Sequence, residues 1–210
     1  MIFPTVLALV AQHPASLAQP PRLLNQTTMV QPDDYPARAA RQDESGIVSM
    51  RLTVDDHGRV TNCAVTESSG STALDAGTCT LLRRKARFAP ALNTNGSPVS
   101  GTHREMIAWS IGSATISPVL ELMLTLPPSQ TPPPAPVTAR LYFNAKGRVT
   151  ECEIVESGGD AVDEAACKIA AAKLSIAPPH SGSSDVAPVG IRDLKVAFRL
   201  APPASGQDRP

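Results

Sequence analysis

Aromatic residues are scarce in this 210-residue sequence, which contains one Trp, two Tyr and four Phe. Neither sign of charge is in excess, because Lys plus Arg and Asp plus Glu number 19 each. A chain without net charge produces no long-range field that would draw it to nucleic acid or to an anionic membrane surface. The composition therefore argues against nucleic-acid binding.

The sequence also lacks an apolar run of the roughly 20 residues that a transmembrane helix needs. Near the N-terminus a short apolar run extends from Val6 to Ala11, followed by small residues at Ser16 and Ala18. Residues 1–18 resemble a secretory signal peptide with cleavage before Gln19, although the basic start of such a signal is missing. An unstructured apolar N-terminus and a misassigned start codon are the alternatives.

A long internal repeat, by contrast, is prominent. The stretch GRVTNCAVTESSG, from Gly58 to Gly70, returns 89 positions later as GRVTECEIVESGG, from Gly147 to Gly159. The similarity continues through the following segments and closes with IAWSI in the first copy and VAFRL in the second. A unit of about 65 residues that occurs twice indicates two copies of a small domain, and not a solenoid.

Cysteine occurs only inside the two copies, with one pair in each. In both copies one cysteine lies on a predicted strand and one on a predicted helix, so we expect the disulfides Cys63–Cys79 and Cys152–Cys167. Buried free thiols are an alternative; zinc would need four ligands in each unit, and the histidines do not repeat between copies. Disulfides indicate an oxidising space such as the periplasm.

The residue pattern of each copy predicts two strands, a helix and a third strand. In the first copy apolar and polar residues alternate from Val48 to Val54, and DDHG then supplies the turn into a second strand. Apolar residues recur at helical spacing from Ser71 to Arg87, and REMIAWSI follows as a last strand. We therefore predict an α+β fold with two small tandem domains, each a three-stranded antiparallel sheet with one helix packed on a face.

Proline is unusually frequent, with 21 residues, and marks the predicted domain boundaries. The predicted parts are a signal peptide (1–18), a first domain (33–112), an apolar segment with a proline-rich linker (113–136), a second, degenerate domain (137–201) and a disordered tail (202–210). The linker LPPSQTPPPAP has the composition of a stiff polyproline spacer, so we predict few contacts between the domains. The segment SPVLELMLTL just before it is apolar enough to pack as an added strand.

Several short motifs of the first copy occur together. They are YPARAARQDESG, VDDHGRVTNCAVTESSGSTALDAGT, RRKARFAPA, and a closing strand that contains Trp109. From Tyr35 to Ile111 these motifs resemble the C-terminal domain of TonB-family proteins, a TonB/TolA-type periplasmic domain. The second copy is a degraded match, because it lacks the tyrosine-proline opening and has Ile176 in place of Phe88.

The resemblance implies an envelope protein that binds a partner by strand addition. Family members known as energy transducers are anchored in the inner membrane and bind a short segment of an outer-membrane transporter by strand addition. Because this sequence has no membrane-spanning segment, we expect a periplasmic binding or scaffolding protein for a protein or peptide partner. The alternative is an energy-transducer component that links an inner-membrane proton-driven complex to TonB-dependent transporters and whose anchor helix lies upstream of Met1.

The candidate partner-binding edge is the closing strand of the first copy. It consists of Glu105, Met106, Ile107, Ala108, Trp109, Ser110 and Ile111. The predicted topology places this strand at a sheet edge, where backbone N–H and C=O groups are open to another strand. Lys195 and Arg199 occupy the matching strand of the second copy, where their charges oppose strand addition. The alternative occupants of the first edge are VLELMLTL folding back and a second chain in a homodimer.

We expect no enzyme activity, cofactor or metal site. Ser68, Ser69 and Asp75 are residue types used in nucleophilic catalysis, but no histidine accompanies them in both copies. A serine before a helix is more often its cap, and an aspartate in the first turn complements the helix dipole.

Overall fold

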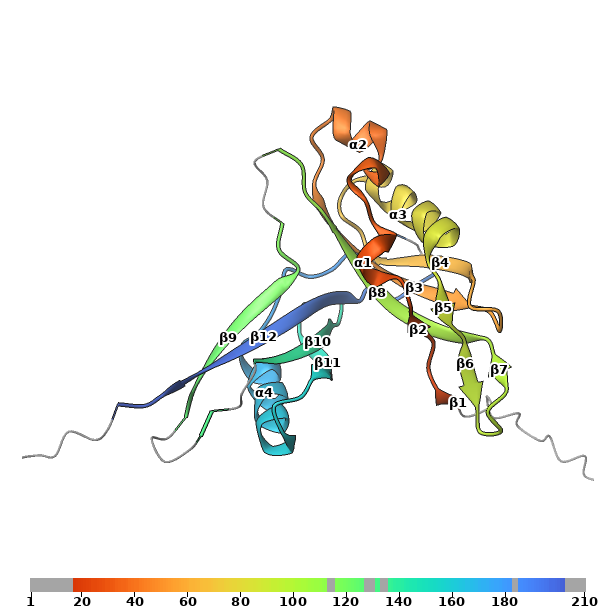
Figure 1. Cartoon of the computed structure of the whole chain (residues 1–210). Coiled ribbons are helices and arrows are strands. Elements are labelled where there is room, and N and C mark those ends of the chain that lie inside the picture. The colour runs from red at the N-terminus through yellow and green to blue at the C-terminus, as the bar shows by residue number, and fades with distance from the viewer. Residues whose placement is uncertain (1–16, 113–115, 127–130, 133–135, 183–184, 203–210) are drawn as a thin grey trace, which may run out of the picture.

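The computed structural model describes residues 17–112, 116–126, 131–132, 136–182 and 185–202. Nearly all of the predicted signal peptide, most of the proline-rich linker and the tail from residue 203 lie outside the described residues. The described part forms a mixed α/β structure. We refer to residues 17–112 as the first half and to residues 116–202 as the second half, and each half is built on one larger sheet with one long helix (Figure 1).

The larger sheet of the first half has three antiparallel strands in the order β4-β3-β8. Strand β3 (Gly46–Val54) forms a hairpin with β4 (Val60–Glu67) and pairs on its other side with β8 (Gly101–Trp109). Helix α3 (Thr72–Lys85) covers one face of this sheet (Figure 1). The buried core includes Val48, Met50, Leu52, Val54, Leu74, Leu82, Ile107 and Trp109.

A glycine fixes the turn between β3 and β4. Gly58 has a φ of +76°, and a Cβ built on it would lie 2.0 Å from the carbonyl oxygen of Phe88. The Phe88 N–H also donates a hydrogen bond to the Gly58 carbonyl at 3.0 Å. In the second half Gly147 and Ile176 have the same relation, again with 2.0 Å between the built Cβ and the carbonyl oxygen. The repeated glycine therefore serves the same close backbone approach twice.

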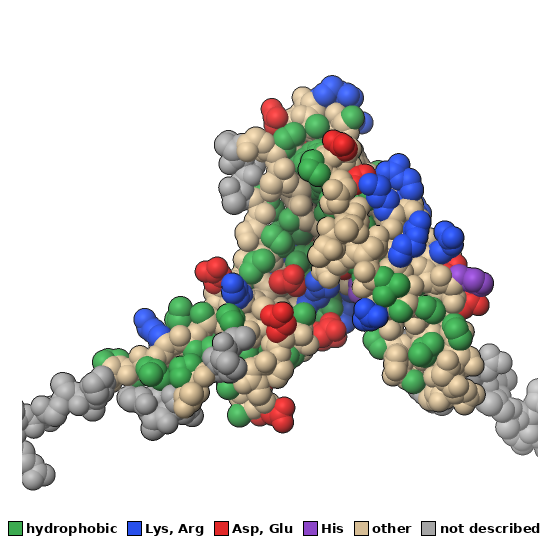
Figure 2. Space-filling view, in the orientation of Figure 1, with side chains coloured by type: hydrophobic (Ala, Val, Ile, Leu, Met, Phe, Trp, Pro, Cys, Tyr) green, Lys and Arg blue, Asp and Glu red, His purple; other side chains and the backbone are tan. Residues whose placement is uncertain are grey.

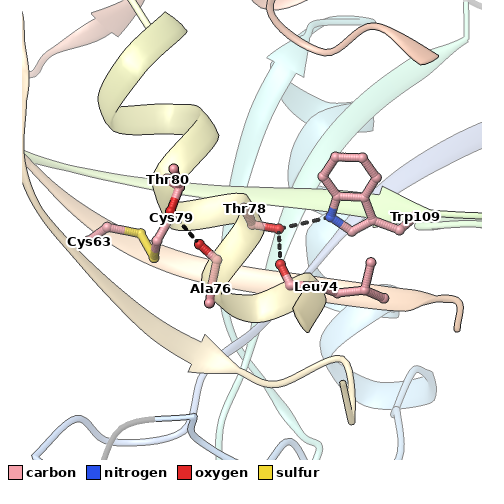
Figure 3. The surroundings of a disulfide bond; sticks show 7 residues. All are labelled: Cys63, Leu74, Ala76, Thr78, Cys79, Thr80 and Trp109. Carbon is pink, nitrogen blue, oxygen red and sulfur yellow. Dashed lines mark hydrogen bonds between the residues drawn. A yellow bond between two sulfur atoms is a disulfide. The ribbon is translucent and has the colours of Figure 1, made fainter. Parts of the chain in front are cut away.

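Polar side chains hold the start and the middle of α3. Ser71 is the N-cap, and its hydroxyl accepts a hydrogen bond from the Leu74 N–H at 3.1 Å. One turn further on, the fully buried Thr78 hydroxyl donates to the Leu74 carbonyl and accepts from the Trp109 indole N–H at 2.8 Å (Figure 3). The buried tryptophan on β8 is thus tied to the helix with its polar group satisfied.

One disulfide in each half joins a strand to the long helix. Cys63 on β4 is bonded to Cys79 on α3 (Figure 3), and Cys152 is bonded to Cys167. These are the two pairings expected from the sequence. Each closes a loop of about 15 residues, which stabilises the fold by about 3 kcal/mol on the loop-entropy estimate.

The first half contains short elements that the sequence did not predict. They are β1 (Leu17–Gln19), β2 (Arg22–Leu23), α1 (Gln26–Met29), the 3-10 helix η1 (Pro32–Asp34), α2 (Ala37–Arg41), β5 (Phe88–Ala89), β6 (Ala91–Asn93) and β7 (Pro98–Val99). The five short strands form two small antiparallel sheets, β1-β6-β7 and β2-β5, beside the larger one. Tyr35, the start of the tyrosine-proline motif, packs edge-on against Trp109 with ring centroids 5.2 Å apart.

The second half has one strand more than predicted. Strands β10 (Val137–Phe143), β11 (Val149–Glu156) and β12 (Gly190–Leu200) pair antiparallel, and helix α4 (Asp160–Lys173) packs on one face. The segment VLELMLTL forms β9 (Val119–Leu126), which pairs parallel to β12 in the order β11-β10-β12-β9. The predicted three-stranded antiparallel sheet is therefore wrong for this half.

The two halves also pack against each other, so the prediction of few contacts between them is wrong. The chain before β12 runs along β4, where the Val189 N–H donates to the Thr66 carbonyl at 3.0 Å. Just after it, the Arg192 guanidinium donates two hydrogen bonds of 2.8 Å to the Glu67 carboxylate, and both side chains are largely buried. The linker composition described only the linker, whereas the contacts come from surfaces of the folded halves.

Candidate functional site

Strand β8 lies at one edge of the first sheet, and no described strand pairs with its outer side. The Ile111 N–H donates to Ser45 Oγ, just before β3, whereas the Met106 N–H donates to Glu105 Oε1 at 3.0 Å. Because backbone groups alternate in direction along a strand, odd-numbered residues face β3 and even-numbered ones face outward. The outward N–H and C=O groups belong to Thr102, Arg104, Met106 and Ala108.

The predicted segment overlaps this edge in part. Strand β8 ends at Trp109, so Ser110 and Ile111 lie beyond it. The side chains of Glu105, Ile107 and Trp109 are buried, and those of Met106 and Ala108 are half-buried.

Thr102 and Arg104 complete the outward edge and lie outside the predicted edge segment, although Arg104 belongs to the predicted last strand REMIAWSI. Residues 102–105 (THRE) are all polar, so no alternation of apolar and polar residues marks the start of the strand in the sequence.

The Glu105 carboxylate accepts a hydrogen bond from one of the outward N–H groups of this edge, that of Met106. Its side chain is 4% exposed, and its carboxylate lies 3.3 Å from His103 Nε2 and 3.4 Å from the Arg140 guanidinium on β10. Burial raises the pKa of this carboxyl, but the His103 hydrogen bond and the Arg140 charge outweigh burial and hold the pKa below its usual value. Glu105 is therefore a carboxylate at neutral pH, and it occupies the Met106 N–H.

Arg104 connects the same edge to the second half. Its guanidinium donates two hydrogen bonds to the Glu151 carboxylate and lies 3.6 Å from the centre of the Tyr142 ring. The hydrogen bonding between Arg104 and Glu151 raises the pKa of Arg104 and lowers that of Glu151. Burial raises the pKa of Tyr142, whose neutral hydroxyl donates to Glu153 at 2.9 Å. These contacts position β10 and β11 beside the middle of β8.

A cleft of about 780 Å³ lies beside this part of β8. Its walls are β8, residues 19–26 at the N-terminal side and strands β10 and β11 of the second half. The charged side chains that line it are Arg22, Arg104, Arg140, Glu105, Glu151 and Glu153. Figure 2 shows acidic and basic side chains side by side where the two halves meet. An extended segment that runs along β8 would enter this cleft, which carries both signs of charge.

The first half corresponds to a known family model. Residues 31–111 match the model of the Gram-negative bacterial TonB protein C-terminal. A search of the curated proteins gave no match. The matched TonB-like region contains β3, β4, α3 and β8, and it ends at the last residue of the predicted edge segment. The resemblance read from the first copy is thereby confirmed, and the second half lies outside the match.

The serine and aspartate residues considered for catalysis form the loop before α3. The hydroxyls of Ser68 and Ser69 donate to the two Asp75 carboxylate oxygens at 2.6 and 2.8 Å. Before α4 the Ser157 hydroxyl donates to Asp163 at 2.6 Å in the same way. The repeated arrangement stabilises the entry to each helix.

A group of three potential metal ligands, Asp55, Asp56 and His57, lies in the exposed turn after β3. One Asp55 oxygen already accepts hydrogen bonds from the N–H groups of His57 and Arg59, at 3.0 and 2.8 Å, as turn aspartates commonly do.

Within the described part of the chain, no helix has the length and apolar character needed to cross a membrane.

Proposed function

We propose that the protein is a periplasmic, non-enzymatic TonB-like binding or scaffolding protein. In this proposal it captures an extended segment of a protein or peptide partner by strand addition along β8. The observation that carries the proposal is the row of outward N–H and C=O groups of β8, whose first part, Thr102 to Glu105, lines a cleft of about 780 Å³. Among these groups the Met106 N–H is already bound to the Glu105 carboxylate. The match of the TonB-like region supports an envelope location, and the two disulfides favour an oxidising compartment.

The way in which β8 is held predicts what the partner must supply. The side chains of Arg104 and Glu105 already have partners within the protein. Binding therefore depends mainly on backbone hydrogen bonds, which are insensitive to side-chain identity. We expect a partner segment that is extended, free of proline at the pairing positions and tolerant of side-chain substitution.

We further propose that the second half is a diverged copy of the first in which the equivalent edge is no longer available. The repeated turn glycine, the repeated cysteine pair and the repeated serine-aspartate bond support a common origin. Strand β12 is the counterpart of β8, and β9 pairs with it from Asp193 to Leu200. This coverage leaves the first half as the copy that binds a partner at its closing strand.

The energy-transducer alternative stays a prediction. The match to the TonB C-terminal model favours it as a second candidate. An in-frame segment upstream of Met1 that encodes about 20 apolar residues after a basic stretch would support it.

Ala108→Pro is the sharpest test of strand addition, because the Ala108 N–H points away from β3. Proline there removes one outward donor and leaves the β3–β8 ladder intact. The probe is a ten-residue peptide selected from a displayed random library against the wild-type chain. We expect its affinity for the variant to fall about tenfold or more, the loss of at least one hydrogen bond, with little change in the melting temperature.

Two controls make this experiment decisive. Ala108→Ser keeps the N–H and should bind as the wild type does, and a peptide N-methylated at alternate residues should not bind the wild type. Unchanged binding to the proline variant would place the site elsewhere. A proline variant that does not fold would mean that β8 is not a free edge.

A further inference from the structure

Strand β9 is the outer strand of the second sheet, and its free side can be assigned residue by residue. The Asp193 N–H donates to the Pro118 carbonyl at 3.0 Å, and the Ala201 N–H donates to the Leu126 carbonyl at 2.7 Å. Even-numbered residues of this segment therefore face β12. The outward N–H and C=O groups belong to Val119, Glu121, Met123 and Thr125. The Ser117 hydroxyl accepts a hydrogen bond from the Val119 N–H and donates one to the Val119 carbonyl.

This second edge lacks the features that protect edge strands in soluble proteins. Its eight residues include no proline and one charged residue, Glu121. Val119 and Met123 are 40% and 55% exposed. Figure 1 places β9 beside β12 at the border of the sheet, and Figure 2 shows hydrophobic side chains on that part of the surface. Among the described residues no strand pairs with the outer side of β9, and a long apolar edge of this kind favours pairing with another strand.

We propose that β9 pairs antiparallel with β9 of a second copy of this chain, around a two-fold axis at Met123. The two four-stranded sheets then form one continuous sheet with both α4 helices on the same face. Because β9 lies outside residues 31–111, this proposal does not rest on the strand addition proposed for β8.

The residue pattern of β9 is self-complementary in this register. Centring the pair on Met123 places Leu122 opposite Leu124 of the second copy and Leu120 opposite Leu126. These leucines lie on the face of the sheet that α4 covers, where Leu120, Leu122 and Leu124 already pack against the core. Pairing through the outward groups of Glu121, Met123 and Thr125 would form hydrogen bonds at three successive outward-facing positions.

Charge complementarity favours a second copy over an unrelated strand. In this register Glu121 lies opposite Thr125 of the second copy. The Thr125 hydroxyl accepts a hydrogen bond from Arg199 Nε at 2.9 Å, so this guanidinium lies beside the arriving carboxylate. The two-fold axis makes this contact twice. A parallel pair would instead set Glu121 against its own copy, and a shift by two residues would place it opposite Met123.

The oligomeric state of the full chain tests the proposal by sedimentation equilibrium over a range of concentrations. We expect the wild type to dimerise and Met123→Lys, which puts two ammonium groups face to face, to raise the dimer dissociation constant about tenfold or more. Val155→Lys is the matched control: Val155 is 61% exposed on β11, at the opposite border of the same sheet, and dimerisation should be unchanged.

Site-specific crosslinking tests the register. Residues at a hydrogen-bonded antiparallel pair have Cα atoms about 5.5 Å apart, within the range for a disulfide. Mild oxidation should therefore crosslink Met123→Cys chains into a dimer and leave Thr125→Cys chains uncrosslinked. A monomeric wild type would overturn the proposal and leave this edge to a strand of another protein. A wild-type dimer for which only the Thr125→Cys variant crosslinks would overturn the register and its charge argument.

Discussion

The two long helices occupy the same place in the repeat but bury different amounts of side chain. Helix α3 buries Leu74, Thr78, Cys79, Leu81 and Leu82 against its sheet. Helix α4 has the same length but buries only Ala166 and Ala170. Because apolar burial is the main source of stability in a small domain, the first half can complete its core with its own residues. The second half has less to bury and depends on additions.

Those additions explain where the open edges lie. The leucines of β9 enlarge the core under α4, and in doing so β9 covers the edge of β12. In the first half the core needs no such strand, so β8 keeps its outer side free of a paired strand among the described residues. A stronger core thus leaves its closing strand without a paired neighbour among the described residues, whereas a weaker core uses the equivalent edge for stability.

The largest expected difference between the halves concerns the aromatic residue of the closing strand. Trp109 is 3% exposed and bonded to Thr78, whereas the matching Phe198 is only partly buried. We expect Trp109→Ala to lower the free energy of unfolding by about 4 kcal/mol and Phe198→Ala by about 1 to 2 kcal/mol. Chemical denaturation measures both. Equal losses would contradict the view that the first core is the stronger one.

The second prediction concerns the ion pair that joins the halves. Glu67→Ala leaves the largely buried Arg192 guanidinium without its carboxylate, which should lower the free energy of unfolding by about 3 kcal/mol. The double variant Glu67→Ala with Arg192→Met removes the unpaired charge and should recover most of that loss. If the single variant is as stable as the wild type, the halves do not support each other through this contact.

Removal of the disulfides should separate the halves by local stability. Cys63→Ser with Cys79→Ser and Cys152→Ser with Cys167→Ser open loops of similar length, so each should cost about 3 kcal/mol. We expect amide hydrogen exchange in α4 to become fast in the second variant, while α3 stays protected in the first because of its larger buried face. Equal protection of the two helices would contradict the comparison.

Much of this organisation could be predicted from the sequence, because it depends on local patterns. The alternation of apolar and polar residues predicted β3, and apolar residues at helical spacing predicted α3 and α4. The repeated cysteine pairs predicted both disulfides. Strand β5 has two residues and forms only against β2, so no local pattern marks it. Likewise, no spacing rule shows that Arg192 is buried against Glu67, because charged residues are usually exposed. The added strand was anticipated, but its parallel partner was not.

Acid should reduce the stability that Glu105 contributes on β8 and should not affect the contribution of the matching residue on β12. Glu105 has its pKa held low when folded, so its stabilising effect is complete above the unfolded pKa of about 4.3 and is lost as pH falls through the lower folded value. At pH 7 Glu105→Gln should cost about 2 kcal/mol, a charge-assisted hydrogen bond, and this difference should shrink below about pH 4. The matching residue is the buried, apolar Leu194, so Leu194→Met should show no such pH dependence. A wild-type-to-variant difference that is constant with pH would contradict the role of the Glu105 charge.

The smallest expected effects lie at the starts of the two helices, where matching positions act in different ways. Ser71 caps α3 with its hydroxyl, whereas the N-cap of α4 is Gly159, which has a φ of +110° and makes no side-chain hydrogen bond. We expect Ser71→Ala to lower the free energy of unfolding by about 1 kcal/mol and Ser71→Gly by only a few tenths, because glycine is an acceptable cap. Gly159→Ala should also cost about 1 kcal/mol, through backbone conformation alone, because a Cβ there meets no atom within 4 Å. Thermal unfolding of the three variants separates the mechanisms. A Ser71→Gly variant as unstable as Ser71→Ala would show that the start of α3 needs the hydrogen bond from the Ser71 hydroxyl itself. A Gly159→Ala variant as stable as the wild type would show that α4 can begin without a positive φ at residue 159.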